Sequence, residues 1–259
     1  MDYQLEGKLA FITGSTKGIG KAAAALLRRE GAEIIIHGRT KESVEAAKWD
    51  LPSAHTVFGD LQDRASVERI VNDVKDIGIV DILVNNAGIY EVKSFAEILD
   101  EDWLKFFEVN VMSGVRLSRA FLPEMLLKSW GRIIFISSES AINIPQEMIH
   151  YGTTKTAQLA VSRGLAELTK GTGVTVNAVL PGPTASEGVQ DFVKTMGQGQ
   201  GMAAFEKQFF SSVRPTSLLQ RFEDPIEIAQ LIAFIASPLS SAINGAALRA
   251  DGGVVKSAF

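Results

Sequence analysis

The chain has 259 residues, of which 46% are hydrophobic and 22% are charged. This is a globular composition with enough apolar material for a buried core, and it excludes disorder along the whole chain. Lys and Arg total 26 against 30 Asp and Glu, a formal net charge of −4, which argues against binding to the nucleic-acid backbone. Without cysteine, and with three scattered histidines, neither a disulfide nor a metal site is expected.

No segment of the sequence indicates export or insertion into a membrane. The first eight residues are polar, and the longest apolar runs, such as residues 231–236, are far shorter than the roughly 18 residues that span a bilayer. The last four residues match no retention or lipidation signal. We therefore expect a cytoplasmic protein without a membrane partner.

Short apolar runs alternate with helical segments along the chain. The runs predict seven strands, at residues 8–13, 33–37, 54–58, 80–84, 132–137, 174–180 and 246–250. The segments predict helices at 21–30, 64–75, 101–128 and 151–170, and a last helix that begins with the capping residues Asp224, Pro225 and Glu227. Most of these strands are almost entirely apolar, as strands buried on both faces are. The order predicts one α/β domain over residues 1–259, a Rossmann-type doubly wound sheet of seven mainly parallel strands with helices on both faces.

Residues 184–215 form the one irregular insertion in this alternation. Glycines at 197, 199 and 201 lie among apolar helical stretches, which suits a movable cover over a substrate site. A surface helical pair with ordinary packing faces explains the same pattern equally well.

A glycine-rich turn follows the first predicted strand and leads directly into a helix. In a doubly wound sheet, ligands bind at the carboxyl ends of the strands. Glycines let the backbone approach a pyrophosphate, whose charge meets the free N–H groups at the helix N-terminus. The turn therefore predicts dinucleotide binding by Gly14, Ser15, Thr16, Lys17, Gly18, Ile19 and Gly20.

A tyrosine and a lysine suggest proton-transfer chemistry. Tyr151 and Lys155 lie four residues apart on a predicted helix, so their side chains can converge. A nearby ammonium, together with a positively charged nicotinamide, is expected to lower the pKa of the tyrosine from about 10 toward neutrality. Tyr151 would then protonate a carbonyl oxygen or deprotonate an alcohol. Ser138 ends a strand and can hydrogen-bond the same oxygen, whereas Ser137 should face the other side of that strand.

Further motifs occur at the ends of the other strands and in the long helix. In this order, and over essentially the whole chain, they resemble the short-chain dehydrogenase/reductase family. The residues that carry the resemblance are the glycine-rich turn, Asp60, Asn85-Asn86-Ala87-Gly88, Asn110, Ser138, Tyr151 with Lys155, and Pro181-Gly182-Pro183-Thr184.

The resemblance implies an enzyme that transfers a hydride between a nicotinamide cofactor and a carbonyl or secondary alcohol. It implies the catalytic set Asn110, Ser138, Tyr151 and Lys155, in which Lys155 also binds the nicotinamide ribose. Asn110 would support a water that connects Lys155 to solvent. The remaining implied cofactor contacts are Asp60, which would touch adenine, and Leu61, Asn86, Ala87, Gly88, Pro181, Gly182 and Thr184.

The end of the second strand indicates which cofactor is preferred. Gly38 stands where NAD-dependent enzymes usually carry an acid that holds the ribose 2′-hydroxyl. Arg39 follows and can pair with a 2′-phosphate, and Lys17 adds a second positive charge. We therefore expect NADP(H) rather than NAD(H).

Two other functions fit parts of this pattern. One is a non-catalytic NADP(H)-binding sensor, which the complete catalytic set disfavours; the other is an NAD-dependent alcohol dehydrogenase. Acyl thioesters, sugars, steroids and small ketones all remain open as the small-molecule carbonyl or alcohol substrate. Tyr90 and Glu91 are candidate pocket residues without an assigned role, whereas His150 is expected to be structural more often than a contact of the substrate. Glu139 and Ser140 depart from the small apolar residues common in the family after the serine, which weakens analogies with the substrates of particular relatives.

The two long predicted helices carry apolar or small residues on more than one face. Such a surplus usually means a partner, and the resembled family pairs these helices across a two-fold axis. We expect a homotetramer, or a homodimer, formed through Trp103, Phe106, Phe107, Val111 and Val115 with Ala157, Ala160, Val161 and Gly164.

Overall fold

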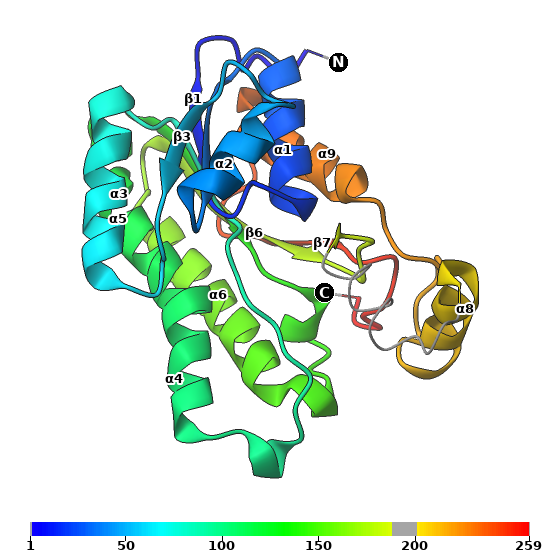
Figure 1. Ribbon diagram of the computed structural model, residues 1–259. Coiled ribbons are helices and arrows are strands. Elements are labelled where there is room, and N and C mark those ends of the chain that lie inside the picture. Colours follow the sequence, from blue (N-terminus) through cyan, green and yellow to red (C-terminus); the bar gives the residue numbers. More distant parts are fainter. Residues whose placement is uncertain (1, 188–200, 259) are drawn as a thin grey trace.

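The computed structural model describes residues 2–187 and 201–258. Its centre is a sheet in the order β3-β2-β1-β4-β5-β6-β7 (Figure 1), in which all neighbouring strands are parallel. The predicted doubly wound sheet is therefore confirmed. The chain order reverses between β1 and β4, and the carboxyl ends of these strands mark the crevice where such sheets bind ligands. The strands are β1 (Leu9–Ile12), β2 (Glu33–Gly38), β3 (His55–Phe58), β4 (Ile82–Asn85), β5 (Trp130–Ile136), β6 (Gly173–Pro181) and β7 (Ala247–Ala250).

Helices cover both faces of the sheet, as predicted (Figure 1). Buried side chains of α1 and α9 pack with Ile34 and Ile36 on one face. Those of α3 and α5 pack with Phe11 and Ile35 on the other. The helices are α1 (Gly18–Arg29), α2 (Lys41–Lys48), α3 (Arg64–Ile77), α4 (Asp100–Phe107), α5 (Ser113–Leu127), α6 (Ile149–Glu167), α8 (Met202–Ser212) and α9 (Pro225–Ala236).

Helix α2 is absent from the sequence-based prediction. It has eight residues, and only Val44 and Ala47 are buried, so its apolar stripe is too short to produce a clear helical period. Its start is set by a capping box, in which Thr40 and Ser43 satisfy each other's backbone N–H groups. This start lies directly after β2, beside Arg39.

The single helix predicted over residues 101–128 is wrong in its middle. A π-helical turn, Glu108–Met112, separates α4 from α5. Such turns widen the helix locally and often occur at functional sites. Asn110 lies in this turn, where its side chain binds both backbone groups of Ile89, accepting from N–H at 2.8 Å and donating to C=O at 3.0 Å.

The insertion predicted at 184–215 contains α8, which stands apart from the sheet (Figure 1). Aromatic rings join α8 to the chain before α9: Phe209 and Phe210 each lie 5.1 Å from Phe222 between ring centroids. The glycines at 197 and 199, on which the idea of a movable cover was based, lie outside the described residues. Among the described residues, no helix combines the length and apolar character needed to cross a membrane.

Candidate active site

The glycine-rich turn joins β1 to α1 at the carboxyl edge of the sheet. Gly14 and Gly18 have φ of +60° and +57°, values that L side chains rarely adopt. A Cβ on Gly20 would lie 2.5 Å from the Asn86 side-chain nitrogen and from the Gly14 carbonyl oxygen. The turn therefore requires glycine both for its conformation and for its close contact with the turn after β4.

Hydrogen bonds fix these two turns to each other. The Thr13 hydroxyl accepts from the backbone N–H groups of Asn86 and Ala87, at 2.9 and 3.0 Å. The Asn86 side-chain amide donates to the carbonyls of Thr13 and Gly14, at 2.9 and 3.0 Å. The side chain of Asn86, predicted as a cofactor contact, thus holds the shape of the glycine-rich turn.

His37 is a functional residue for which the sequence predicts no role. Its ring lies 3.1 Å from the Gly14 backbone nitrogen through Nδ1 and 3.1 Å from the Gly59 carbonyl oxygen through Nε2. Burial lowers the pKa of His37 to about 4, so the ring is neutral and Nδ1 can accept the N–H of Gly14. No spacing in the sequence indicates a residue that connects the ends of three strands.

The N-terminus of α1 already holds a negative group. The carboxylate of Glu187 accepts a hydrogen bond from the Gly18 backbone N–H at 2.7 Å. Free N–H groups and the helix dipole make this end of a helix favourable for anions. The turn therefore fits the pyrophosphate of a dinucleotide, and Glu187 occupies part of the place where that group would bind.

A hollow of about 470 Å³ lies beside the ends of β2 and β3. Arg39, Asp60 and Arg69 are among the residues that line it, so the structure brings together the residues predicted to bind the adenosine end. The side chains of Arg39, Asp60 and Lys17 are exposed, whereas Leu61 is buried. The side chain of Leu61 therefore belongs to the core.

The predicted catalytic side chains converge at the carboxyl end of β5. Ser138 follows β5 and is close enough to Tyr151 to lower the pKa of its hydroxyl, and the Lys155 Nζ lies 5.6 Å from the centroid of the Tyr151 ring. Lys155 also donates to the carbonyl of Ile136 at 2.8 Å. Ser137 turns instead toward α6 and donates to the backbone carbonyl of Lys155 at 2.9 Å, which confirms that the two serines face opposite ways.

The pKa values of the pair differ from the expectation. Burial raises the pKa of Tyr151 to about 12, an effect that the neighbouring Ser138 side chain only partly offsets. Burial also lowers the pKa of Lys155 to about 7. The predicted lowering of the tyrosine pKa by Lys155 is therefore wrong for the protein by itself, because desolvation disfavours both charged forms. Tyr151 holds its proton at neutral pH.

Asn110 is connected to Lys155 through a side chain that the prediction missed. The backbone carbonyl of Asn110 accepts from the side-chain amide of Gln158 at 2.5 Å. The side-chain oxygen of Gln158 lies 3.4 Å from the Lys155 Nζ. Gln158 lies three residues after Lys155, on the same face of the helix, and this spacing is the signal that sequence analysis could have used.

The loop after β6 closes the cofactor side of the site. The Gly182 N–H donates to the carbonyl of Ala250 and to the carboxylate of Glu223, at 2.9 and 3.1 Å. A Cβ on Gly182 would meet the backbone of Asp251 at 2.8 Å. Thr184 is buried and its hydroxyl donates to the Gly182 carbonyl at 3.0 Å. Pro181, Gly182 and Thr184 thus form a rigid wall at the ends of β6 and β7.

His150, which we expect to be a structural residue rather than a contact of the substrate, packs against aromatic rings. It is fully buried between α4 and α6, where its ring centroid is 4.1 Å from that of Phe106 and 6.2 Å from that of Trp103. Among the described residues neither ring nitrogen has a hydrogen-bond partner. Its surroundings are aromatic packing rather than a reacting group.

Comparisons with known proteins show the family of this chain. The family model for short chain dehydrogenases matches residues 8–197. A protein of Bacillus subtilis (strain 168) named Uncharacterized oxidoreductase YvrD is 50% identical over 262 residues, which cover 99% of this chain and 100% of that protein.

Two solved structures show the same architecture over nearly the full length. L-sorbose reductase from Gluconobacter frateurii, complexed with NADPH and L-sorbose, has a TM-score of 0.93 and 30% identity, covering 99% of this chain and 100% of that one. A 3-oxoacyl (acyl-carrier-protein) reductase from Agrobacterium tumefaciens C58 with NADP bound has a TM-score of 0.89 and 27% identity, covering 97% and 96%.

Proposed function

This chain belongs to the short-chain dehydrogenase family of oxidoreductases, and we propose that it uses NADP(H) to interconvert a carbonyl compound and a secondary alcohol. The observation that carries the proposal is the position of the Lys155 Nζ, 5.6 Å from the centroid of the Tyr151 ring, with Ser138 beside them at the same sheet edge as the glycine-rich turn. A proton donor, a hydrogen-bond donor to the developing oxyanion and a turn suited to bind a dinucleotide lie at this edge. Two of the solved relatives are bound to NADPH and to NADP, which supports the choice of cofactor.

The cofactor would be held by residues that the structure brings to this edge. Backbone N–H groups at the start of α1, that of Gly18 among them, would bind the pyrophosphate, as the contact between Gly18 and Glu187 indicates. Arg39 and Lys17 would pair with the 2′-phosphate, and Asp60 lines the hollow for the adenosine end. When bound, NADPH supplies the hydride that the carbonyl carbon accepts.

The chain's own residues supply the proton. Because its pKa is about 12, Tyr151 is protonated at neutral pH and donates its proton to the carbonyl oxygen as the alcohol forms. The Ser138 hydroxyl donates a hydrogen bond to the same oxygen and stabilises its developing charge. Gln158 accepts from the Lys155 Nζ and donates to the Asn110 backbone carbonyl, contacts that help to hold the Lys155 side chain beside Tyr151.

The described residues near both ends of the segment 184–215 support the proposal that this segment covers the substrate. Glu187 reaches the turn at Gly18, and Arg214 lies beside Glu139, the neighbour of Ser138. The segment therefore approaches the cofactor side and the substrate side of the site. The substrate itself stays open between sugars and acyl thioesters, because the relatives include both a sorbose reductase and a 3-oxoacyl reductase.

Replacing Tyr151 with Phe tests the function. The change removes one hydroxyl and keeps the ring, so turnover of a ketone found by screening should fall by about 10²–10⁴-fold. NADPH affinity, measured by titration, should change little because the turn and Arg39 remain. Tyr3→Phe makes the same chemical change away from the site and should leave both quantities unaltered. A sensor protein would bind NADPH without turnover in the wild type and in both variants.

A further inference from the structure

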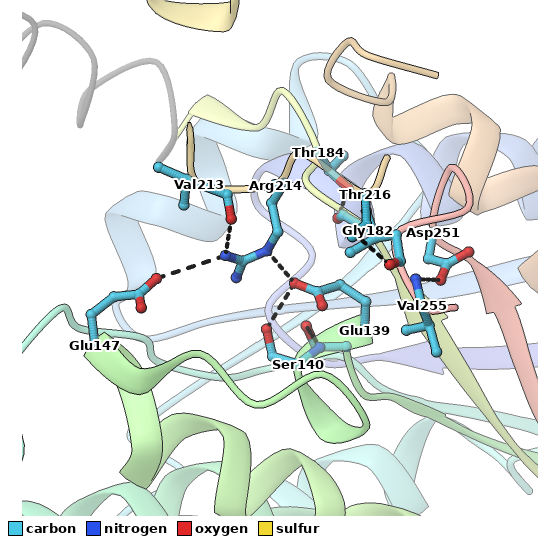
Figure 2. A network of polar contacts seen from close by, with 12 residues as sticks. Glu139, Ser140, Glu147, Gly182, Thr184, Val213, Arg214, Thr216, Asp251 and Val255 are labelled. Carbon is cyan, nitrogen blue, oxygen red and sulfur yellow. Dashed lines mark hydrogen bonds and ion pairs between the residues drawn. The ribbon is translucent and has the colours of Figure 1, made fainter. Parts of the chain in front are cut away.

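Arg214 connects the two chain segments that carry the catalytic hydroxyls (Figure 2). Its Nε donates to the Oε1 of Glu139 at 2.9 Å, and Glu139 directly follows Ser138. Its Nη1 lies 3.7 Å from the Oε1 of Glu147, four residues before Tyr151. Arg214 and Glu139 are 8% and 3% exposed, so this ion pair is inside the protein.

The pair has polar atoms that other residues leave unused. Oε1 of Glu139 accepts from Arg214 and from the hydroxyl of Ser140, at 2.9 and 3.0 Å. Its Oε2 is buried and has no hydrogen-bond partner among the described residues. Arg214 donates through Nε and Nη1, and no hydrogen bond of its Nη2 occurs in the described part of the chain. Burial of an unpaired carboxylate oxygen is unfavourable, and burial raises the pKa of Glu139.

Both charges act on the reacting group. Burial has the largest effect on the pKa of Tyr151 and Ser138 lowers it; Glu139 also raises this pKa and Arg214 lowers it. Because Arg214 contacts both Glu139, next to Ser138, and Glu147, four residues before Tyr151, the ion pair lies at the segments that carry the two hydroxyls.

We infer that the Glu139–Arg214 pair recognises a hydroxyl group next to the reacting carbonyl, so that the substrates are uncharged hydroxyketones and polyols. A hydroxyl donates one hydrogen bond and accepts others, and can therefore satisfy the Oε2 of Glu139 and the Nη2 of Arg214 together. The apolar chain of a simple ketone can neither donate a hydrogen bond to this oxygen nor accept one from this nitrogen. This inference rests on the proposed function.

The charge around Arg214 disfavours an acidic substrate. Two carboxylates, Glu139 and Glu147, contact its single guanidinium, and Asp251 lies near enough to raise the pKa of Glu139. The cluster therefore has excess negative charge, which repels a substrate carboxylate. An uncharged hydroxyl is the group that this environment accepts.

A pair of ketones that differ by one hydroxyl tests the inference. The kcat/KM for 3-hydroxybutan-2-one should exceed that for butan-2-one by at least about a hundredfold in the wild type, because a site built to bond a hydroxyl rejects the analogue without it. In Glu139→Gln and in Arg214→Lys the ratio should fall to less than about tenfold. The ratio is independent of the fraction of folded enzyme, so partial unfolding of a variant does not affect it. Glu68→Gln, in an exposed ion pair on α3, should keep the wild-type ratio.

The outcomes separate this inference from the proposed function. Equal use of both ketones by the wild type would overturn the inference and leave the oxidoreductase assignment intact. Variants that lose activity equally toward both ketones would also overturn it and would make the ion pair purely structural. Reduction of no ketone or aldehyde by the wild type would instead remove the proposed function, and the inference with it.

Discussion

The carboxylate of Glu187 and the backbone N–H of Gly18 are joined by a hydrogen bond of 2.7 Å. Gly18 opens α1, and its N–H is one of the donors that a cofactor pyrophosphate would use. Two negative groups cannot share this donor without strong repulsion. Binding of NADPH therefore requires that Glu187 moves away.

Replacing Glu187 with Gln should tighten NADPH binding. The change removes the competing charge from the helix N-terminus, and we expect the Kd to fall by about three- to tenfold. Isothermal titration of both proteins measures this. Glu33→Gln removes one negative charge at the amino end of β2 and should leave the Kd unchanged. An unaltered Kd in Glu187→Gln would show that the contact does not oppose the cofactor.

Replacing Arg39 with Asp should weaken NADPH binding by about a hundredfold or more, since a phosphate loses its partner and gains a repelling charge. NADH lacks this phosphate and should be far less affected. Fluorescence titration with both cofactors gives the two ratios. Arg29→Asp, at the exposed end of α1, is the matched control. Wild-type protein that binds both cofactors equally well would contradict the predicted preference.

His37 should make the protein sensitive to acid. Its pKa is about 4 in the folded chain and near 6.5 when unfolded. Between these pH values the unfolded chain binds a proton that the folded chain does not, so stability falls as the pH falls, by up to about 3 kcal/mol. In His37→Asn, whose side-chain oxygen can take the place of Nδ1 toward Gly14 and whose amide does not titrate, this part of the loss should disappear.

Urea unfolding at pH 7 and pH 4.5 measures the effect as the difference between wild type and variant, since the other groups titrate in both. His55→Asn, at the exposed start of β3, should retain the wild-type loss. Equal losses in wild type and His37→Asn would exclude His37 as the source.

A homotetramer remains our expectation, on a changed set of residues. Phe106 and Val111 are buried within the chain, so they do not add to a surface for a partner. Leu104 and Phe107 of α4 are 67% and 43% exposed, so they do form part of a surface for a partner. Light scattering should give four times the 27.9 kDa of one chain. Leu104→Lys should reduce this mass, whereas Ile79→Lys, at an exposed loop residue, should not. A wild-type mass of one chain would contradict the expectation.

The sequence by itself determined the sheet, its parallel strands and the edge of the sheet that carries the motifs. Nearly continuous apolar runs such as β1 and β5 signal burial on both faces, and a glycine turn between a strand and a helix signals an anion site. Both depend on residues close together in the chain, so spacing alone reveals them. The pair Tyr151 and Lys155 was predictable for the same reason, since one helical turn separates them.

The tertiary structure decided the electrostatics and the long-range contacts. The raised pKa of Tyr151 depends on how much protein surrounds its hydroxyl, which no local pattern records. His37, Glu187 and Arg214 act through partners 23, 169 and 75 residues away. Only the folded sheet, which brings the carboxyl ends of its strands to one edge, places such residues together, because their contacts depend on topology rather than on sequence spacing.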